Sequence, residues 1–301
     1  MSAGDALHGP ARPGAQGGMP RAHVCALLTS FNRVEKTLAS LRALEVAAAH
    51  AELALDAVLV DDGSTDGTAA RVRARFDWVQ VEENNGPPLF WCRGMHRAMT
   101  LGLARSPSHF LLLNDDTMLY PGALSELLAC LESPPAGALV IAVGSTRDAV
   151  SGRHSYGGER SRTSSRPLSL RPVAPSAEPQ DLDTFNGNVV LIPMPVVHRV
   201  GLMDAGFEHA MGDIDYGFRA RRAGVRLRLA AGFQGTCSNN PASGTYLDKS
   251  LPFGTRWQLL LGRKGLPWRS WLKLTSRHGG RIWPAYFVWP YLKLIWEGVR
   301  R

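Results

Sequence analysis

The sequence predicts an α/β fold, with a mostly parallel, twisted sheet that carries helices on both faces. Between His23 and Val143, short apolar runs alternate with longer segments of helix-forming composition. Such alternation is typical of β-α-β units, whose strands run parallel. The apolar fraction of 45% is enough for a full core, and 301 residues allow one large α/β domain with an appendage.

The apolar runs are the expected strands, and the segments between them are the expected helices. Strands are predicted at residues 24–29, 57–60, 78–81, 110–113, 139–143, 189–192 and 225–229, and helices at residues 34–44, 68–75, 89–104 and 122–131. Asp66 and Thr68 can supply cap oxygens to the second helix. A later helix begins at Asp213, because acids occupy its first turn, arginines its last, and Gly224 suits the position after its end.

The composition divides the chain into three parts. Residues 1–22 are rich in Gly, Ala and Pro without an apolar core, so they are expected to be a disordered lead and not a secretory signal. Residues 23–249 are expected to form the main domain, in which the Ser- and Arg-rich stretch 144–181 is a hairpin or a mobile loop. Residues 250–301 are expected to form an aromatic and basic helical appendage. Met19 is a second candidate for the start of translation.

The charge and the cysteines exclude several classes of protein. The net charge of +8 and a pI near 9.7 favour anionic partners. Nucleic acid is not expected, because no RNP, zinc-finger or helix-turn-helix pattern occurs. The four cysteines are widely spaced, which argues against a disulfide framework or structural zinc and fits the reducing cytoplasm. No stretch reaches the ~20 apolar residues that span a bilayer.

Two of the expected strands end in adjacent carboxylates, Asp61-Asp62 and Asp115-Asp116. Ligands of α/β proteins bind outside the carboxyl ends of the strands. Neighbouring carboxylates repel each other, so a partner is expected for each pair. The alternatives are local, since Asp62 could bond the backbone of its own turn and the second pair could cap the helix that follows.

Four motifs in this order resemble the family 2 glycosyltransferases, which have the GT-A fold. They are LTSFNR at residues 28–33, VDDGSTDGT at residues 60–68, LNDDT at residues 113–117 and GDID at residues 212–215. They correspond to the family's T-x-(Y/F)-N-R start, first acidic motif, D-x-D motif and E-D motif. The resemblance covers about residues 23–240 and is strongest to the rhamnosyltransferase-like branch of bacterial polysaccharide and cell-envelope enzymes. The chain departs from the family at Asn114, which replaces Asp, and at Gly212, which replaces Glu.

The resemblance implies an inverting, metal-dependent enzyme of hexosyl or deoxyhexosyl transfer. Its donor would be a nucleotide diphosphate sugar and its acceptor a glycan or a lipid-linked sugar. Asp213 would be the general base, and Asp116 would hold Mg²⁺ or Mn²⁺, which prefer oxygen ligands. The donor-binding residues that the resemblance implies are Thr29, Phe31, Arg33, Asp61, Asp62, Arg93, Asn114 and Asp115.

Several points stay open at this level. A third metal ligand is missing from the expected region, residues 232–244, where Cys237 is the nearest candidate, with His209 and His278 as alternatives. Arg219 and Arg222 suit either a phosphate or the end of a helix. A glycine-rich phosphate loop, which a nucleotidylyltransferase or an NAD enzyme would need after the first strand, does not occur. The two departures from the family leave a non-catalytic sugar- or membrane-binding module as the alternative function.

The C-terminal segment interleaves Trp, Tyr and Phe with Arg and Lys, and Pro284 and Pro290 interrupt it. This composition suits an interfacial segment, with rings at the headgroup level and cations against anionic lipid. Two interpretations therefore stay open: the aromatic side chains pack on the main domain, or the segment makes peripheral contact with the inner face of the cell membrane. The sugar, the nucleotide base, the acceptor and the oligomeric state are left undetermined.

Overall fold

The protein is described by a computed structural model that covers residues 22–132, 137–238 and 243–299. The main sheet consists of β1 (His23–Ser30), β2 (Ala54–Asp61), β3 (Val79–Glu83), β4 (His109–Leu113), β6 (Val140–Val143), β10 (Gln180–Asp181), β12 (Val189–Pro193) and β13 (Arg226–Leu229). The flanking helices are α1 (Val34–His50), α2 (Thr68–Arg75), α3 (Phe90–Gly102), α4 (Ala123–Glu132), α5 (Met194–Val200) and α6 (Gly212–Arg222). The expected lead, apart from Ala22, lies outside the described residues.

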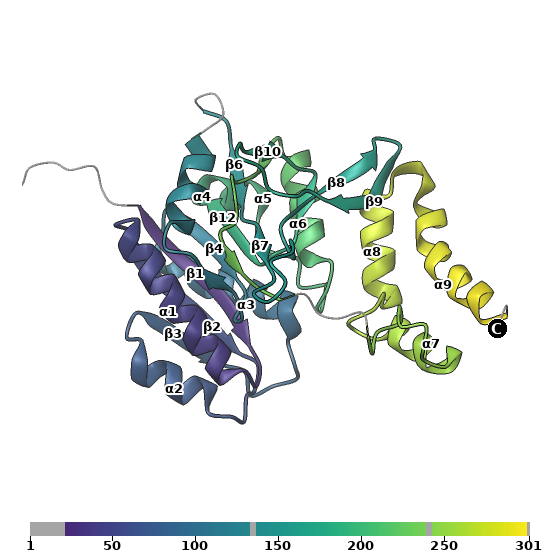
Figure 1. Ribbon diagram of the computed structural model, residues 1–301, viewed down its shortest axis with the longest axis horizontal. Coiled ribbons are helices and arrows are strands. Elements are labelled where there is room, and N and C mark those ends of the chain that lie inside the picture. Colours follow the sequence, from purple (N-terminus) through teal and green to yellow (C-terminus); the bar gives the residue numbers. More distant parts are fainter. Residues whose placement is uncertain (1–21, 133–136, 239–242, 300–301) are drawn as a thin grey trace, which may run out of the picture.

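The strand order of the main sheet is β10-β13-β6-β12-β4-β1-β2-β3 (Figure 1). Parallel pairs join β1 to β2 and to β4, β2 to β3, and β6 to β13. Strand β12 runs antiparallel to β4 and β6, and β10 runs antiparallel to β13. The prediction of a mostly parallel α/β sheet is therefore confirmed.

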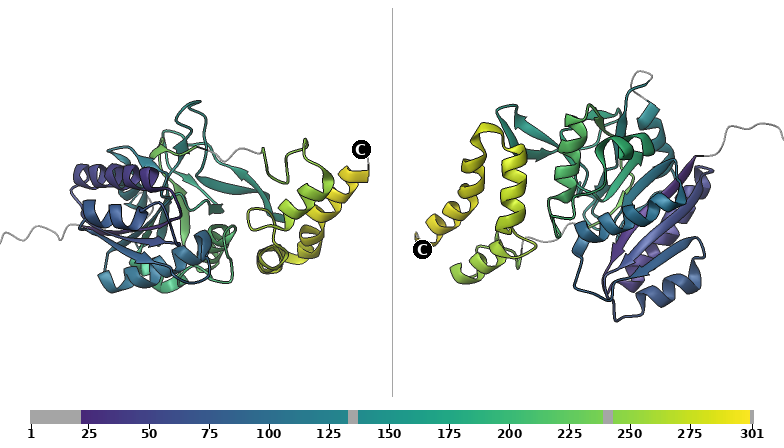
Figure 2. Two further views of the ribbon diagram at one scale, coloured as in Figure 1. Left: turned by 90° about the horizontal axis from the view of Figure 1, so that it is seen from below. Right: turned by 180° about the vertical axis from the view of Figure 1, so that it is seen from behind.

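Helices cover both faces of this sheet (Figure 2). Successive side chains of a strand point to opposite faces, so the buried Leu27 and Leu28 of β1 belong to different halves of the core. Leu27 packs in the half that includes α3, α5 and α6, whereas Leu28 packs in the half that includes α1, α2 and α4. Since both faces are covered, the central strands are apolar throughout and end where polar residues begin.

The predicted elements agree with the structure, but the smallest strands and helix α5 were not predicted. Helix α2 has the predicted bounds, and α1 continues six residues beyond the predicted end at Leu44. The stretch 144–181 contains a hairpin of β8 (Gly158–Thr163) and β9 (Arg166–Pro172), to which β11 (Thr184–Phe185) pairs. A third sheet of β5 (Met118–Leu119), β7 (Thr146–Arg147) and β14 (Gly235–Thr236) was not predicted, because two-residue strands show no periodicity.

The C-terminal segment is helical, as predicted, with α7 (Phe253–Leu261), α8 (Trp268–His278) and α9 (Trp283–Val299). The hairpin β8–β9 reaches toward these helices, and α8 contacts both β9 and α6 (Figure 1). Within the described ranges, none of the helices combines the length and apolar character that crossing a bilayer requires.

Candidate active site

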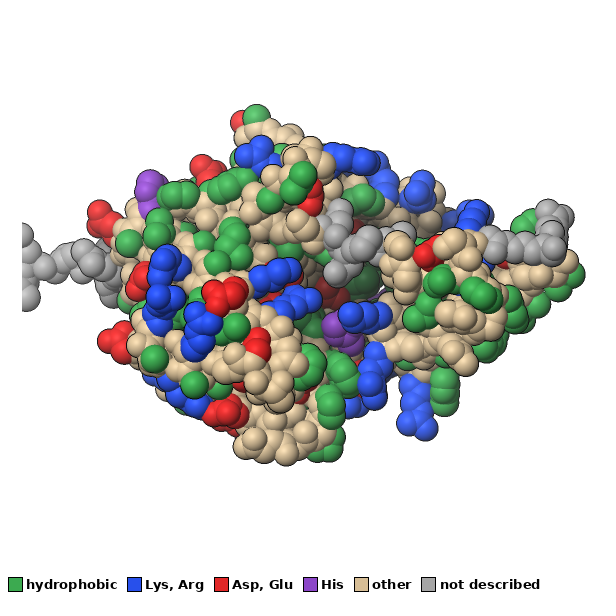
Figure 3. Space-filling model, turned by 60° about the horizontal axis from the view of Figure 1, so that its bottom comes forward, with side chains coloured by type: hydrophobic (Ala, Val, Ile, Leu, Met, Phe, Trp, Pro, Cys, Tyr) green, Lys and Arg blue, Asp and Glu red, His purple; other side chains and the backbone are tan. Residues whose placement is uncertain are grey.

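The four sequence motifs meet at one end of the main sheet. Strands β4, β1 and β2 are neighbours, so the residues that follow them lie side by side at their carboxyl ends. Seen from this side, the molecule is hollowed between the main domain and the C-terminal helices, with acidic side chains inside and basic side chains at the rim (Figure 3).

Asp62 fastens the loop that leads into α3. Its carboxylate accepts hydrogen bonds from the backbone N–H groups of Leu89 and Phe90, both at 2.8 Å, and from Asn84 Nδ2 at 2.7 Å. Only 8% of Asp62 is exposed, and both of its oxygens are engaged. The first carboxylate pair therefore contains one residue that positions a loop.

Asp61 has a different set of partners. Its Oδ1 accepts a hydrogen bond from the backbone N–H of Ser64 at 3.0 Å, so Asp61 makes the local turn bond that was considered for Asp62. No described residue donates to its Oδ2. Asp61 thus keeps an acceptor for a ligand at the end of β2, although only 2% of the residue is exposed.

The segment after β1 is bound to the turn after β2. The side-chain oxygen of Asn32 accepts the backbone N–H of Thr65 at 2.8 Å, and the backbone N–H of Asn32 bonds Ser64 Oγ at 2.9 Å. Asp66 accepts the backbone N–H groups of Val34 at 2.9 Å and Thr68 at 3.1 Å, so it serves the first turns of both α1 and α2. These bonds hold the first two motifs as one unit.

Arg33 lies on the second carboxylate pair. Its Nη1 is 3.2 Å from Asp115 Oδ1 and 2.9 Å from Asp116 Oδ2. Burial raises the pKa of Asp115 to about 6, although the nearby Arg33 acts to lower it. A positive charge thus already lies between the two carboxylates, which shows that this position suits a cation.

The pair fits a hard divalent cation, which takes carboxylate oxygens together with phosphate oxygens and water. Among the described residues, no group of three His, Cys, Asp or Glu side chains completes such a site. Cys237 Sγ is 3.5 Å from Asp116 Oδ1, but burial and that carboxylate raise the pKa of the thiol to about 12. A sulfur ligand is also soft, so Cys237 is a poor ligand for Mg²⁺ or Mn²⁺.

The two histidines considered as metal ligands differ in their surroundings. His278 Nε2 is 2.8 Å from Asp215 Oδ1 and its ring stacks on Phe218. The ring of His209 lies edge-on to that of Phe90, with 6.4 Å between the centroids, and burial together with the charges of Lys264 and Arg33 lowers its pKa.

Asp213 stands in the first turn of α6. Its carboxylate accepts the backbone N–H groups of Gly187 at 3.0 Å and Ile214 at 2.9 Å. Burial raises its pKa, and no cation in the described part of the chain pairs with it. A carboxylate without a counter-ion accepts a proton more readily than an ordinary aspartate.

Trp91 connects Asp213 to the second carboxylate pair. Its indole Nε1 donates to Asn114 Oδ1 at 2.8 Å, next in sequence to Asp115. The adjacent Cζ2–Cη2 edge of the ring covers Gly187, where a Cβ would lie 2.3 Å from it. Since the backbone N–H of Gly187 bonds Asp213, Trp91 contacts the neighbours of both acidic sites. Sequence reasoning missed both Trp91 and Gly187.

Both departures from the family pattern have a local explanation. Asn114 accepts the hydrogen bond of Trp91. A Cβ at Gly212 would lie 2.1 Å from Cys92 Sγ on α3, so the close packing of α6 on α3 leaves no room for a larger residue. Neither departure removes Asp213 or the second carboxylate pair.

Asp215 points away from Asp213, as the helical spacing predicted, and is fully buried. It is paired with Arg219 at 2.8 Å, and with Arg277 and His278 of α8, also at 2.8 Å. Burial acts to raise the pKa of Asp215, but the hydrogen bonds from these three side chains lower it. Arg219 also donates to the carbonyls of residues 200 and 202, so its bonds are structural. Arg222 donates to the carbonyl of residue 277.

The other predicted donor residues have mixed surroundings. Thr29 packs against Gly94, where a Cβ would lie 2.7 Å from Thr29 Oγ1. Phe31 is 55% exposed at the rim. Arg93 donates to the carbonyl of Ala205 at 3.1 Å and pairs with Glu208 at 3.4 Å. A role for these three in donor binding stays a prediction.

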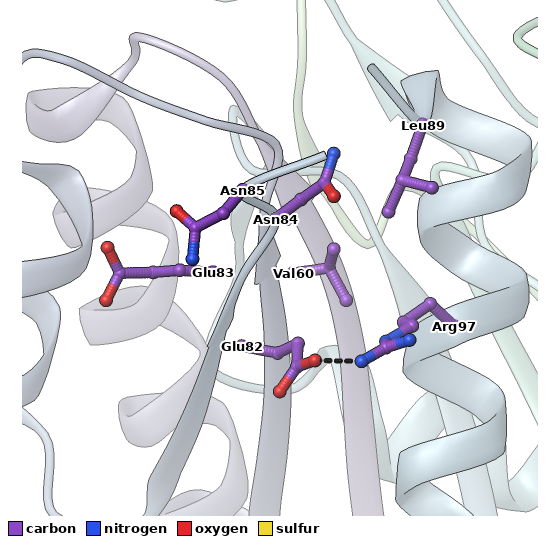
Figure 4. Close-up of a pocket in the computed structure, with 7 residues that line it drawn as sticks. All are labelled: Val60, Glu82, Glu83, Asn84, Asn85, Leu89 and Arg97. Carbon is purple, nitrogen blue, oxygen red and sulfur yellow. Dashed lines mark hydrogen bonds and ion pairs between the residues drawn. The ribbon is translucent and has the colours of Figure 1, made fainter. Parts of the chain in front are cut away.

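A pocket of about 270 Å³ lies between the end of β3 and α3 (Figure 4). It is lined by Val60, Glu82, Glu83, Asn84, Asn85, Leu89 and Arg97. Arg97 and Glu82 form an ion pair in it. Asn84 and Leu89 also bond Asp62, so the pocket adjoins the β2 end of the site.

Comparison with known proteins decides the family. The model of the family described as glycosyl transferase family 2 matches residues 25–179, about half of the chain. The chain belongs to glycosyl transferase family 2. The succinoglycan biosynthesis protein ExoU of Rhizobium meliloti (strain 1021) is 35% identical over an alignment of 112 residues, and the match covers 35% of this chain and 30% of ExoU. This family 2 chain thus spans less than a third of that relative's length.

Two solved structures show that this family 2 chain has the GT-A fold. One is the mannosyltransferase PcManGT from Pyrobaculum calidifontis in complex with GDP-Man and Mn²⁺, with a TM-score of 0.51, 15% identity and coverage of 91% of this chain and 70% of that one. The other is GalNAc-T7 with UDP, GalNAc and Mn²⁺, with a TM-score of 0.51, 13% identity and coverage of 73% and 45%. The predicted GT-A fold is therefore confirmed.

Proposed function

We propose that this chain transfers a hexosyl or deoxyhexosyl group from a nucleotide diphosphate sugar to a glycan or lipid-linked acceptor, with inversion at the anomeric carbon. The observation that carries the proposal is Asp213, a carboxylate that no cation of the described residues pairs with. Trp91 contacts both Gly187, which bonds Asp213, and Asn114, which precedes Asp115. In a displacement reaction, a base is needed beside the attacking hydroxyl and a cation beside the departing diphosphate. Asp213 and the Asp115–Asp116 pair suit these two tasks.

The proposed reaction is a single displacement. Asp213 takes the proton of the acceptor hydroxyl as that oxygen bonds the anomeric carbon. The bond from this carbon to the diphosphate oxygen breaks, and its electron pair leaves with the diphosphate. One displacement inverts the configuration, and no covalent enzyme intermediate forms.

In this proposal the two strand-end pairs hold the donor. The free Oδ2 of Asp61 would accept the ring N–H of a uracil, thymine or guanine base, while Asp62 fixes the loop beside it. Asp116, with Asp115 beside it, would hold Mg²⁺ or Mn²⁺, which offsets the negative charge of a diphosphate when it is bound. Both structural neighbours carry Mn²⁺ with a nucleotide or nucleotide sugar, which supports this assignment.

The proposal is tested by calorimetric titration of the purified protein with UDP, dTDP and GDP, each with Mn²⁺, Mg²⁺ or EDTA. We expect binding of one nucleotide that requires the metal. Nucleotide sugars on the matching base, a deoxyhexose included because of the rhamnosyltransferase-like resemblance, are then screened for hydrolysis and transfer. The anomeric configuration of the product is read by NMR. If no nucleotide binds with any metal, or if the product retains its configuration, the proposal is wrong.

Helix α9 offers a surface for an acceptor that is bound to a membrane. Its outward-facing apolar residues recur at helical spacing, and the outer stripe consists of Ala285, Val288, Trp289, Leu292, Ile295, Trp296 and Val299. Trp289 is 65% exposed and Trp296 is 55% exposed. Exposed Trp side chains beside basic residues are typical of proteins that sit at a membrane surface. We therefore include peripheral contact with an anionic bilayer in the proposal.

This part of the proposal is tested by flotation with vesicles of phosphatidylcholine, with and without phosphatidylglycerol. The wild type is expected to float with the anionic vesicles, whereas a Trp289→Asp, Trp296→Asp variant stays in the dense fraction. Val150→Asp changes an exposed apolar residue of the main domain and serves as the control. Equal flotation of wild type and double variant would show that the outer stripe does not bind the bilayer.

A further inference from the structure

We propose that Arg33 is a built-in counter-ion of the Asp115–Asp116 pair, which a divalent metal displaces and which then binds the diphosphate of the donor. The inference rests on the proposed function and assigns Arg33 to the diphosphate end of the site, whereas the family resemblance implied only a general role in donor binding. Arg33 would compete with the metal for the carboxylate pair, and the displaced guanidinium group would bind the diphosphate as its new partner.

The competition follows from the atoms that Arg33 contacts. One nitrogen, Nη1, bonds an oxygen of each carboxylate, at 3.2 Å to Asp115 and 2.9 Å to Asp116. A metal held by these two residues would need the same face of the pair, and two cations in one place repel each other. Metal binding therefore has to remove the ion pair, which lowers the affinity for the metal alone.

The backbone of Arg33 is fixed, whereas its guanidinium group can move. Its carbonyl accepts hydrogen bonds from the backbone N–H of Thr37 at 2.9 Å and from Thr37 Oγ1 at 3.0 Å, and the neighbouring Asn32 is bound to Thr65. The side chain, by contrast, is 43% exposed. Only Nη1 bonds a described residue, so Nε and Nη2 remain available as donors. A fixed backbone with a long exposed arm allows the head group to change partners without a loop rearrangement.

The diphosphate is the partner that suits the displaced group. A guanidinium presents paired N–H donors that match phosphate oxygens in a bidentate way. The metal would bring these oxygens to the carboxylate pair, within the reach of the same arm. Arg33 would thus oppose the metal in the free protein and support the donor in the complex.

The experiment measures binding and not turnover. Mn²⁺ alone is titrated by electron paramagnetic resonance into wild type, Arg33→Gln and Arg33→Lys. UDP, GDP and dTDP are then titrated by calorimetry at saturating Mn²⁺. Arg33→Gln is expected to bind Mn²⁺ about fivefold more tightly, since the partly exposed ion pair no longer competes. It is expected to bind the nucleotide about tenfold more weakly, since charged hydrogen bonds to phosphate are lost. Arg33→Lys keeps the charge without the planar group, so its Mn²⁺ affinity stays near that of the wild type.

Arg105→Gln is the matched control, because this arginine is 37% exposed and pairs with Asp56 at 3.9 Å, near the other end of β2. It should leave both affinities unchanged. An unchanged or lower Mn²⁺ affinity in Arg33→Gln overturns the competition, and unchanged nucleotide affinity overturns the binding of the diphosphate by Arg33. The Mn²⁺ titration requires no nucleotide, so these failures are distinct from a wild type that binds no nucleotide with any metal, which would overturn the proposed function itself.

Discussion

At the scale of single residues, Asp213 and Asp215 lie two positions apart on α6, yet their pKa values shift in opposite directions. Asp213 has only backbone partners, and burial raises its pKa. Asp215 is surrounded by Arg219, Arg277 and His278, and their hydrogen bonds lower its pKa despite burial. A proton acceptor must be free of permanent counter-ions, so of these two acids only Asp213 is suited to act as the base.

Replacement of the base should separate binding from transfer. Asp213→Asn is expected to keep donor binding and to lower the rate of transfer about 10²- to 10⁴-fold, the usual contribution of a general base. Because the carboxylate must be ionised, wild-type activity is lost as the pH falls through the raised pKa. The acid limb of the kcat/KM profile should therefore lie above the ordinary aspartate value of about 3.9. A variant with full activity, or an acid limb at the ordinary value, would reassign the base.

Asp61 and Asp62 should respond differently to the same substitution. Asp62→Asn turns an amide toward backbone N–H donors, so it is expected to lower the free energy of unfolding by about 1–3 kcal/mol. Asp61→Asn keeps the acceptor for Ser64 and is expected to leave unfolding nearly unchanged while weakening nucleotide binding about tenfold. Urea unfolding and calorimetry measure the two effects. The interpretation fails if the two variants show the same changes in the free energy of unfolding and in nucleotide affinity.

At the scale of elements, α8 is fastened to the helix that carries Asp213. Arg277 Nη1 is 2.8 Å from Asp215 Oδ1 and 2.9 Å from Asp204 Oδ2, and Lys273 is 2.7 Å from Asp204 Oδ2. Asp215 is fully buried, so its charge requires these partners. The C-terminal helices are therefore bound to the base helix through ion pairs as well as by apolar packing.

Loss of one of these ion pairs should weaken the attachment. Arg277→Met is expected to lower the free energy of unfolding by about 1–2 kcal/mol, a modest value because the arginine is 31% exposed. Arg281→Met, an exposed residue near the end of α8, is the control. The folded-state pKa of Asp215 is lowered, so its stabilisation is present above the ordinary aspartate pKa and is lost as the pH falls through the folded-state pKa. Arg277→Met removes one of the hydrogen bonds that lower this pKa, so its deficit in unfolding free energy against the wild type should shrink once the carboxylate is protonated in the folded variant. A deficit that stays constant down to the pH of acid unfolding would contradict this account.

The elements that could be predicted are those with enough residues to show a period or a run. Strands β1, β2 and β4 each contain an apolar run, and the acids that follow the runs of β2 and β4 lie at one end of the sheet. The strands β5, β7 and β14 have two residues each and left no pattern. Local sequence thus determined the scaffold and the place of the carboxylates.

The contacts that give these carboxylates different roles could not be predicted from the sequence. Arg33 and Asp115 are 82 positions apart in the sequence, and only the adjacency of β1 and β4 brings them together. Gly187 shows no signal of its own, because its function is to leave space for the ring of Trp91. Such contacts depend on which elements become neighbours in the fold and on how they are aligned, and a single sequence does not reveal this.

At the scale of the whole molecule, the charge is concentrated at one end. Residues 250–301 contain ten of the 34 Lys and Arg residues but only one of the 26 acids, Glu297. That segment therefore carries +9, and the 249 residues before it together carry −1. The net positive charge of the chain therefore comes from the segment that carries the outer stripe of α9.

This distribution predicts how salt should affect membrane binding. The electrostatic attraction of the C-terminal segment to anionic vesicles is screened as the Debye length falls from about 10 Å at 0.1 M to about 3 Å at 1 M salt. Flotation should weaken as the salt concentration rises across this range, but some binding should remain because of the apolar outer stripe. Nucleotide binding at the buried Asp61 should change less. Binding to neutral vesicles that equals binding to anionic ones would contradict the prediction.

The contact between Gly212 and Cys92 makes the thiol a built-in sensor of α6 opening. The sulfur lies directly beneath the first residue of the helix, is fully buried, and burial raises its pKa. A thiol reagent can reach it only after an opening of the structure, and we expect the smallest such opening to be separation of α6 from α3. The rate of Cys92 alkylation, measured with the other three cysteines replaced, would therefore report how often the base helix detaches, and ligands that close the site should slow it.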